Sequence, residues 1–216
     1  MKKLLSRVLC AAFALSAAVL PAFAADEIHV TVDGEPVAFT DAKPFVNAND
    51  RTMVPLRAVA TALGCEVGWN SEAQVACTDW HVVVPGKLED EELFGVPGVQ
   101  TFSDDFRLRL FLKEGQNVIA FDHEETWSGG SLSEPMDQSI GAGAFTIDTA
   151  PVIQNGRTYL PIRAVAEMYG YSVSWDGKTN TVIINNDDNG SYFGAYNDSN
   201  AVEVPNWVVY DGFKMN

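Results

Sequence analysis

The chain has 216 residues and carries 29 acidic against 14 basic residues, a formal net charge of −15 at pH 7. This balance argues against nucleic acid and anionic lipid as partners, because like charges repel. We attribute the acidity to solubility rather than to cation binding.

The first 24 residues are typical of a bacterial secretory signal peptide. A basic start, MKKLLSR, precedes an apolar run too short to span a bilayer, and an Ala-Phe-Ala cleavage pattern ends at Ala24. Cys10 lacks the small residues before it that a lipoprotein anchor needs. Removal of this leader leaves 11 basic residues against 29 acidic ones, a net charge of about −18. The sequence therefore predicts a protein that is secreted and extracellular or cell-wall associated, without membrane insertion after cleavage.

Residues 25–79 predict a first small unit of strands and one helix. Alternating residues on both sides of Asp33-Gly34 indicate a hairpin, and a strand, a turn and a strand follow up to residue 56. Apolar residues at helical spacing then predict a helix that ends at Gly64. Residues 65–78 predict a closing hairpin.

Two cysteines, Cys65 and Cys77, lie in that closing hairpin. Alternation from Cys65 and from Cys77 places both sulfurs on the core side, within bridging range. Export permits a disulfide, so a bridge and a pair of buried free thiols are both open. A catalytic cysteine is not expected, since no histidine lies near in a supporting pattern.

Residues 80–106 are expected to form a linker or exposed insertion, because they hold an acidic run at 89–92 and Gly-Pro punctuation. Residues 107–186 predict a second unit with the same order of elements, a turn at Asn155-Gly156, a helix over 162–169, and a long internal loop at 123–143. Residues 187–216 form a polar and aromatic tail.

The two units are copies of one another. Residues 51–69 and 157–175 are identical at 10 of 19 positions, which indicates an internal duplication. The framework residues that both copies keep are Arg51, Pro55, Arg57, Gly64 and Trp69, matched by Arg157, Pro161, Arg163, Gly170 and Trp175. The prolines stand where a strand gives way to a helix, the glycines suit left-handed helix caps, and the tryptophans are expected to pack inward.

The arginines of each copy allow two interpretations. The first arginine follows the turn, and the second opens the helix, where the macrodipole mildly disfavours a positive charge. In one interpretation they bind backbone carbonyls or a carboxylate such as Asp50 or Asp176. In the other, both arginines of one copy form a site for an anion or a sugar acid.

The sequence was also searched for catalytic, cofactor, metal and carbohydrate-binding residues. The chain lacks the common hydrolase, nucleotide and zinc motifs, and its three histidines have no ligand spacing, so we expect no catalytic residue, no cofactor and no metal site. The segment from Asn185 resembles a calcium loop, but Tyr196 stands where a glutamate is needed. Trp127, Tyr192 and Trp207 are candidates for stacking on a carbohydrate, or for filling gaps between the copies.

The repeated pattern P-x-x-x-N-G-R-T-x-[VL]-P-[LI]-R-A-V-A-E-x-x-G-x-x-V-x-W-D, followed by T-x-T-V-x-I, resembles the copper amine oxidase N-terminal-like domain, also called the stalk domain. The second copy matches from Pro151 to Ile184, and the first from Pro44 to Cys77 with departures at 49–50, 61 and 70. The resemblance covers roughly residues 27–185. It implies an α+β fold, with two repeats of a small antiparallel sheet packed on one short helix. It also implies a non-catalytic module of exported bacterial proteins, because the oxidase chemistry belongs to another, larger domain.

These observations favour a secreted, non-catalytic module of the cell envelope with a binding or spacing role. Its partner would be a cell-wall polysaccharide or an exported protein. One alternative is an accessory or inhibitory subunit of a secreted hydrolase. A further alternative is a hydrolase whose site lies in the 80–143 insertions.

Overall fold

The structure, a computed structural model, describes residues 27–88, 100–129, 137–186 and 193–215. The expected signal peptide and the acidic run at 89–92 lie outside these residues. The first half of the chain forms β1 (His29–Val32), β2 (Glu35–Pro36), β3 (Phe45–Val46), β4 (Thr52–Pro55), α1 (Leu56–Ala62), β5 (Glu66–Asn70) and β6 (Val75–Leu88). The second half forms β7 (Gln100–Lys113), β8 (Val118–Gly129), β9 (Asp137–Thr146), β10 (Val152–Gln154), β11 (Arg157–Pro161), α2 (Ile162–Met168), β12 (Tyr171–Asp176), β13 (Thr181–Asn186), β14 (Ala201–Val202) and β15 (Lys214–Met215). Strands with two short helices confirm the α+β class.

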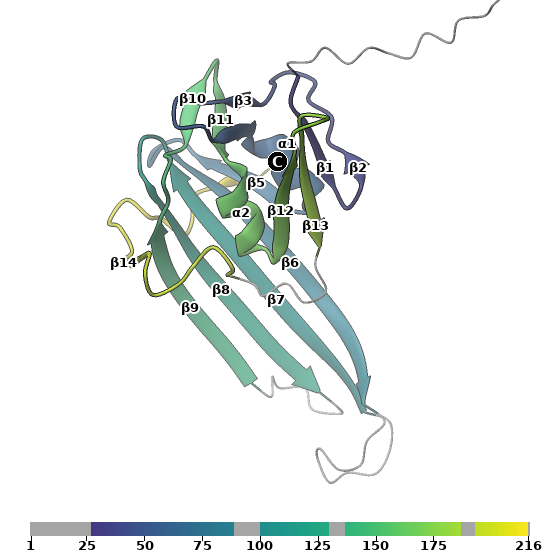
Figure 1. The fold of residues 1–216 in the computed structure, drawn as a ribbon. Helices are drawn as coiled ribbons and strands as arrows, with labels where there is room; N and C mark the ends of the chain where they lie inside the picture. The colour runs from purple at the N-terminus through teal and green to yellow at the C-terminus, as the bar shows by residue number, and fades with distance from the viewer. Residues whose placement is uncertain (1–26, 89–99, 130–136, 187–192, 216) are drawn as a thin grey trace, which may run out of the picture.

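Strands of the two repeats share their sheets. One four-stranded sheet has the order β12-β13-β1-β2 and the other β10-β11-β4-β3 (Figure 1). In the first, β1 runs parallel to β13, with His29 opposite Thr181. In the second, β4 runs antiparallel to β11. The repeats are therefore interleaved, and neither forms the self-contained sheet on its own helix that the sequence predicted.

The β4–β11 pair relates the repeats by a local two-fold axis. Val54 lies opposite Leu160, its equivalent in the other repeat, while Met53 lies opposite Pro161 and Pro55 opposite Tyr159. The two helices follow directly on these strands. Each begins after a proline in extended conformation and is followed by a glycine with positive φ, 81° at Gly64 and 80° at Gly170, where a side chain would be strained.

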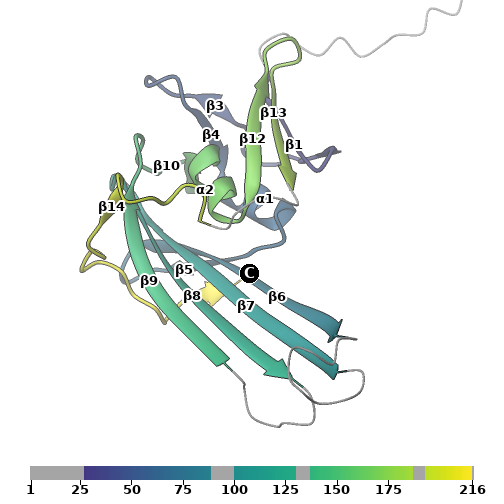
Figure 2. The ribbon, with the colours of Figure 1, turned by 60° about the horizontal axis from the view of Figure 1, so that its bottom comes forward.

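The third sheet has seven strands in the order β14-β9-β8-β7-β6-β5-β15. Its strands β6 to β9 are long and continue well beyond the helices (Figure 2). In the four-stranded sheet β12-β13-β1-β2, the hairpins β12–β13 and β1–β2 lie side by side. The corresponding hairpins of the long sheet are β5–β6 and β8–β9. Strand β7 is inserted between them, so that four neighbouring strands run in alternating directions.

The long sheet corrects two expectations. Residues 80–106 are not a linker where the structure describes them, because 80–88 belong to β6 and 100–106 to β7. The expected loop at 123–143 is strand β8 up to Gly129 and strand β9 from Asp137. Polar side chains in these stretches are compatible with strands, because they pair across neighbouring strands, as His81 of β6 does with Asp105 of β7.

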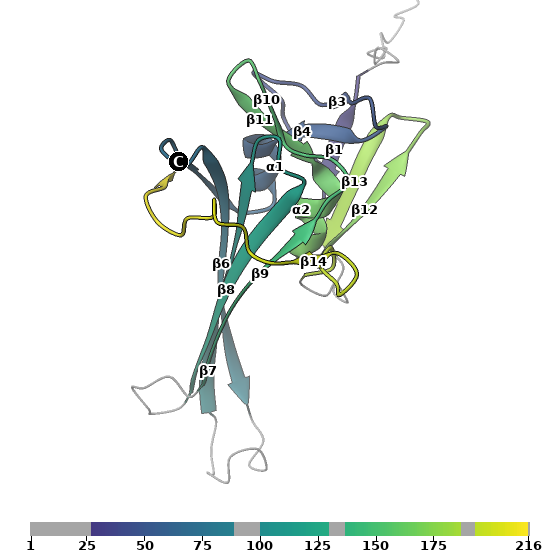
Figure 3. The same ribbon diagram turned by 90° about the vertical axis from the view of Figure 1, so that its left-hand side faces the viewer.

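The long sheet buries apolar side chains on both of its faces. One face packs on the two helices and includes Leu108, Leu110, Leu112 and Ile119. The opposite face holds a smaller cluster of Val75, Cys77, Phe111, Ala120 and Ala144. The tail covers this cluster with Trp207, Val208 and Phe213. Figure 3, which views the sheet from its edge, shows the helices on one side and the C-terminal end on the other.

The register of this sheet separates the two cysteines. In β5–β6, Val67 lies opposite Thr78 and Gly68 opposite Cys77. Opposed residues point to the same side, so Cys77 points away from the side of Val67 and Cys65. Both thiols are free and buried, in different clusters. The expected placement on one face is wrong, because the register opposes odd-numbered residues of β5 to even-numbered residues of β6.

Candidate functional site

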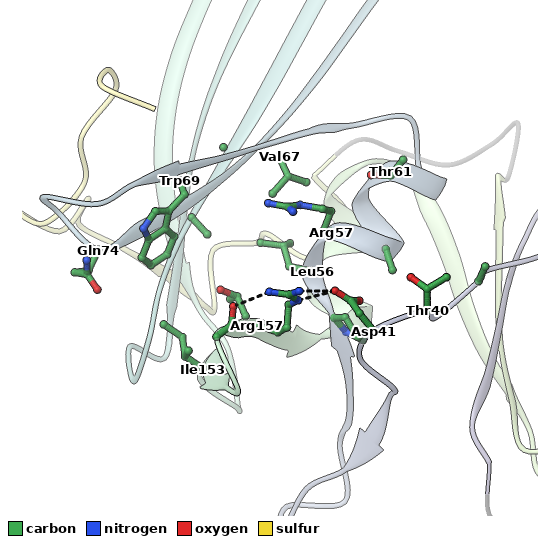
Figure 4. A pocket seen from close by; sticks show the side chains of 17 residues that line it. Thr40, Asp41, Leu56, Arg57, Thr61, Val67, Trp69, Gln74, Ile153 and Arg157 are labelled. Atoms are coloured by element: carbon green, nitrogen blue, oxygen red, sulfur yellow. Dashed lines mark hydrogen bonds and ion pairs between the residues drawn. The ribbon is translucent and has the colours of Figure 1, made fainter. Parts of the chain in front are cut away.

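A pocket of about 680 Å³ opens where the first repeat meets the β10–β11 hairpin of the second (Figure 4). Its apolar floor includes Leu56, Val67, Ala76 and Ile153. Its polar and aromatic lining comprises Thr40, Asp41, Arg57, Thr61, Trp69, Gln74, Arg157 and Thr158. Residues of both repeats are needed to close it.

Arg157 reaches the pocket from the second repeat. The turn at Asn155-Gly156, with φ of 51° and 70°, directs the chain into β11, where Arg157 is the first residue. Its Nε donates to Oδ2 of Asp41 at 2.8 Å, and its Nη2 lies 2.6 Å from the same oxygen. The guanidinium thus binds a carboxylate of the other repeat.

An equivalent ion pair links an arginine of the first repeat to an aspartate of the second. Nε of Arg51 donates to Oδ2 of Asp148 at 2.5 Å, so the turn arginine of each repeat binds an aspartate of the other. The carboxylates expected from the sequence are not the partners: Asp176 instead accepts from the backbone N–H of Lys178 and the hydroxyl of Thr179 within its own turn. Arg51 also donates to the backbone carbonyl of Asn49.

The helix arginines differ between the repeats. Arg163 donates to Oε1 of Glu167 at 3.1 Å, one helical turn away. At the equivalent place in the first repeat stands Thr61, and within the described part of the chain Arg57 makes no side-chain hydrogen bond or ion pair. In Figure 4 the Arg57 guanidinium extends along the pocket wall toward Trp69. The pocket therefore joins Arg57 of one repeat to Arg157 of the other, rather than two arginines of one repeat.

The two tryptophans also differ. Trp69 is half-buried, packs against the main core and presents its indole to the pocket (Figure 4). Trp175 is 47% exposed, which corrects the expectation that both tryptophans pack inward. It lies on β12, the outer strand of its sheet among the described strands. The strand of Trp69 has a neighbour on each side, because β15 pairs beside β5 and places Lys214 opposite Trp69.

The remaining aromatic candidates lie elsewhere. Trp207 packs against the cluster around Cys77, on the sheet face away from the helices, and so fills a gap in the core. The side chain of Trp127 and the whole of Tyr192 lie outside the described residues. Among the described aromatic side chains, Trp69 lines the pocket, although the sequence assigned it to the framework.

The histidines and acidic residues of the long sheet are engaged in separate contacts. Among the described residues no group of three or more His, Cys, Asp and Glu side chains is placed to hold a metal ion. His81 pairs with Asp105 through Nε2 at 2.6 Å, and His123 stacks on Phe106 and meets the ring of Phe193 edge to face. The hydrogen bonds and ion pair with Asp79 raise the pKa of the Arg107 guanidinium.

The sequence also contained a signal for the aspartates that was missed. Asp41 stands three residues before Pro44, and Asp148 three residues before Pro151, so a D-x-x-P stands at matching places in the two repeats. Gln74 and Thr40 had no such signal, because they line the pocket only once the hairpins are folded together.

No helix in the described part of the chain has the length and apolar character that crossing a membrane requires.

Comparison with known proteins places the repeats in a family. No curated protein and no solved structure matches the chain significantly. The sequence model of the copper amine oxidase N-terminal domain matches residues 31–94 and 139–205, which include the duplicated segments 51–69 and 157–175 and together make up more than half of the chain. The chain therefore belongs to the copper amine oxidase N-terminal domain family, a family of non-catalytic stalk-like modules.

Proposed function

We propose that the chain is an exported, non-catalytic module of the cell envelope that binds wall glycan in the pocket between its repeats. The observation that carries this proposal is the meeting of the Trp69 indole with Arg57 and the Asp41–Arg157 pair around one open pocket. Sugars offer apolar ring faces to an indole and hydroxyl groups to charged and amide side chains, so this combination suits a saccharide.

The dimensions of the pocket agree with such a ligand. Sites for small ligands commonly measure about 300–1,000 Å³ and combine an apolar floor with a few polar groups, and this pocket has both. The hydroxyls of Thr40 and Thr158 and the amide of Gln74 add donors and acceptors. The leader-like N-terminal segment supports export, which would bring the module to the wall.

Sedimentation with purified cell wall tests the proposal. The chain from residue 25 onward is expected to sediment with insoluble wall, and Trp69→Ala is expected to weaken this binding about tenfold, the loss of one stacked ring. Trp175→Ala, at the equivalent place in the other repeat, is the matched control and should bind as the parent does. Equal binding by parent and Trp69→Ala would refute the pocket as the site. We also expect no turnover of glycoside, peptide or ester substrates.

A protein partner has one observation in its favour. Within the described strands, β6 beyond Asp79 pairs only with β7, and β9 before Ala144 only with β8. Val83 and Ile140, on these outer strands, are 51% and 71% exposed. An extended segment of an exported hydrolase would be able to add to either edge. Ile140→Lys would then weaken capture of that hydrolase and leave wall binding unchanged.

A further inference from the structure

We infer that the pocket recognises a carboxylate on its glycan, that Arg57 is the residue that binds it, and that the second repeat has no such site. This inference rests on the proposed function. It comes from one difference between the repeats. Thr61 of the first repeat stands where the second has Glu167, the ion-pair partner of its helix arginine.

The second repeat shows what the helix arginine does when a glutamate follows it. Glu167 stands four residues after Arg163 on α2, and their side chains form an ion pair at 3.1 Å. Residues at this spacing face each other on a helix. The positive charge of Arg163 is thereby balanced within its own repeat.

The first repeat lacks this balance. The position equivalent to Glu167 is Thr61, which has no charge and is too short to reach the guanidinium. Both Thr61 and Arg57 line the pocket, whereas the charge of Arg157 there is already balanced by Asp41. The three charged side chains of the pocket therefore leave one net positive charge, and Arg57 carries it.

This charge selects the ligand. A guanidinium presents a planar set of N–H donors that matches a carboxylate or phosphate, and such charge-assisted hydrogen bonds are about twice as strong as neutral ones. One uncompensated charge in a chain with a net charge of −15 fits an isolated carboxylate better than a polyanion, which the rest of the surface repels. A glycan carrying carboxylates on or beside its sugar rings places such a group next to the ring that stacks on Trp69.

The test compares untreated cell wall with the same wall after its carboxylates have been converted to amides. We expect the parent chain to bind the amidated wall at least tenfold more weakly, the value of one charged hydrogen bond. Arg57→Gln should bind both walls with the weak affinity of the parent for amidated wall. Thr61→Glu should do the same, because it supplies the missing carboxylate from within the helix.

Arg163→Gln is the matched control, since it is the same change at the equivalent helix position, and it should retain the preference for untreated wall. If the parent binds both walls equally, or if Arg57→Gln keeps the preference, the carboxylate site is refuted and the proposed function stands. If the parent binds neither wall, the proposed function fails, and the inference fails with it. Circular dichroism and the unfolding midpoint of each variant establish that it is folded.

Discussion

Val54 and Leu160 lie opposite each other at the centre of the β4–β11 pair, although each belongs to a different repeat. They are equivalent residues, so the local two-fold axis passes between them. Helix α1 contacts β11 and α2 contacts β4, which means that each helix packs on a strand of the other repeat. Two copies of one sequence thus form one structural unit, in the manner of a symmetric dimer whose subunits are covalently joined.

The first prediction concerns that centre. Leu160 is 1% exposed, so Leu160→Ala should lower the free energy of unfolding by about 2–5 kcal/mol through lost burial and a residual cavity. Both repeats should still unfold in a single urea transition, seen alike by tryptophan fluorescence and by circular dichroism. The surface change Lys178→Ala is the control and should alter stability by less than about 0.5 kcal/mol. Two separated transitions would show that the repeats are independent.

The second prediction concerns the reciprocal ion pairs. Arg157 and Asp41 have side chains about half exposed, so solvent screens their attraction. Arg157→Gln and Asp41→Asn should each lower stability by no more than about 1 kcal/mol, with a coupling of about 0.2–1 kcal/mol in a double-mutant cycle. The pair Arg51 and Asp148 provides an independent cycle with the same expected size. A coupling above about 2 kcal/mol would contradict the picture of a screened surface contact.

The third prediction concerns a glycine beneath a histidine ring. Gly141 lies opposite His123, and a Cβ at Gly141 would lie 2.2 Å from Cε1 of that ring. The ring is held by Phe106 and Phe193, so it has little room to move. Gly141→Ala should lower the free energy of unfolding by about 1–3 kcal/mol, and His123→Ala in the same chain should restore much of the loss. Gly177→Ala, which meets nothing closer than 3.4 Å, is the control.

The fourth prediction concerns alkaline pH. Burial raises the pKa of the Cys65 and Cys77 thiols to about 12, whereas an unfolded cysteine titrates near about 8.5. Between these values the unfolded chain releases protons that the folded chain keeps. Stability should therefore be intact below about pH 8.5 and fall by about 1.4 kcal/mol per pH unit for each thiol above it, until the folded thiols ionise.

Urea unfolding at pH 8, 9 and 10 measures this slope. Cys65→Ala and Cys77→Ala should each reduce it by the share of one thiol, and an unchanged slope in both variants would refute the cause. Thiol titration of the chain from residue 25 onward should find no accessible thiol in the native state at pH 8 and two after denaturation. A single oxidised pair would contradict their positions on opposite sheet faces.

Local patterns in the sequence predicted the local elements of this fold. The two helices, the turns at Asp33-Gly34 and Asn155-Gly156, and the glycines after the helices lie where spacing and turn chemistry placed them. The pairing of β1 with β13 carries no local signal, because its residues are about 150 positions apart and their alternation suits any neighbour.

The candidate site was harder to predict for a related reason. Arg57 and Trp69 were identified, but as framework of their own repeat, since no pattern indicates that β10–β11 of the other repeat closes a pocket over them. The cysteines show how sensitive such predictions are to register: one residue of difference in the β5–β6 turn decides whether Cys77 shares a face with Cys65. The substitution of Thr61 for a glutamate was visible from the start, yet its meaning depended on the contact between Arg163 and Glu167.

The parallel pairing of β1 with β13 also bears on how the molecule is made. Strand β1 is the first element of the described chain, and its partner ends at Asn186. While the polypeptide emerges from a ribosome, its earliest strand can pair only with the two-residue strand β2 until β13 has appeared. Folding of this sheet is therefore expected to begin late. It depends on contacts between residues far apart in the sequence, and such contacts slow folding. The four-stranded sheet β12-β13-β1-β2 is therefore completed only after most of the chain has been made.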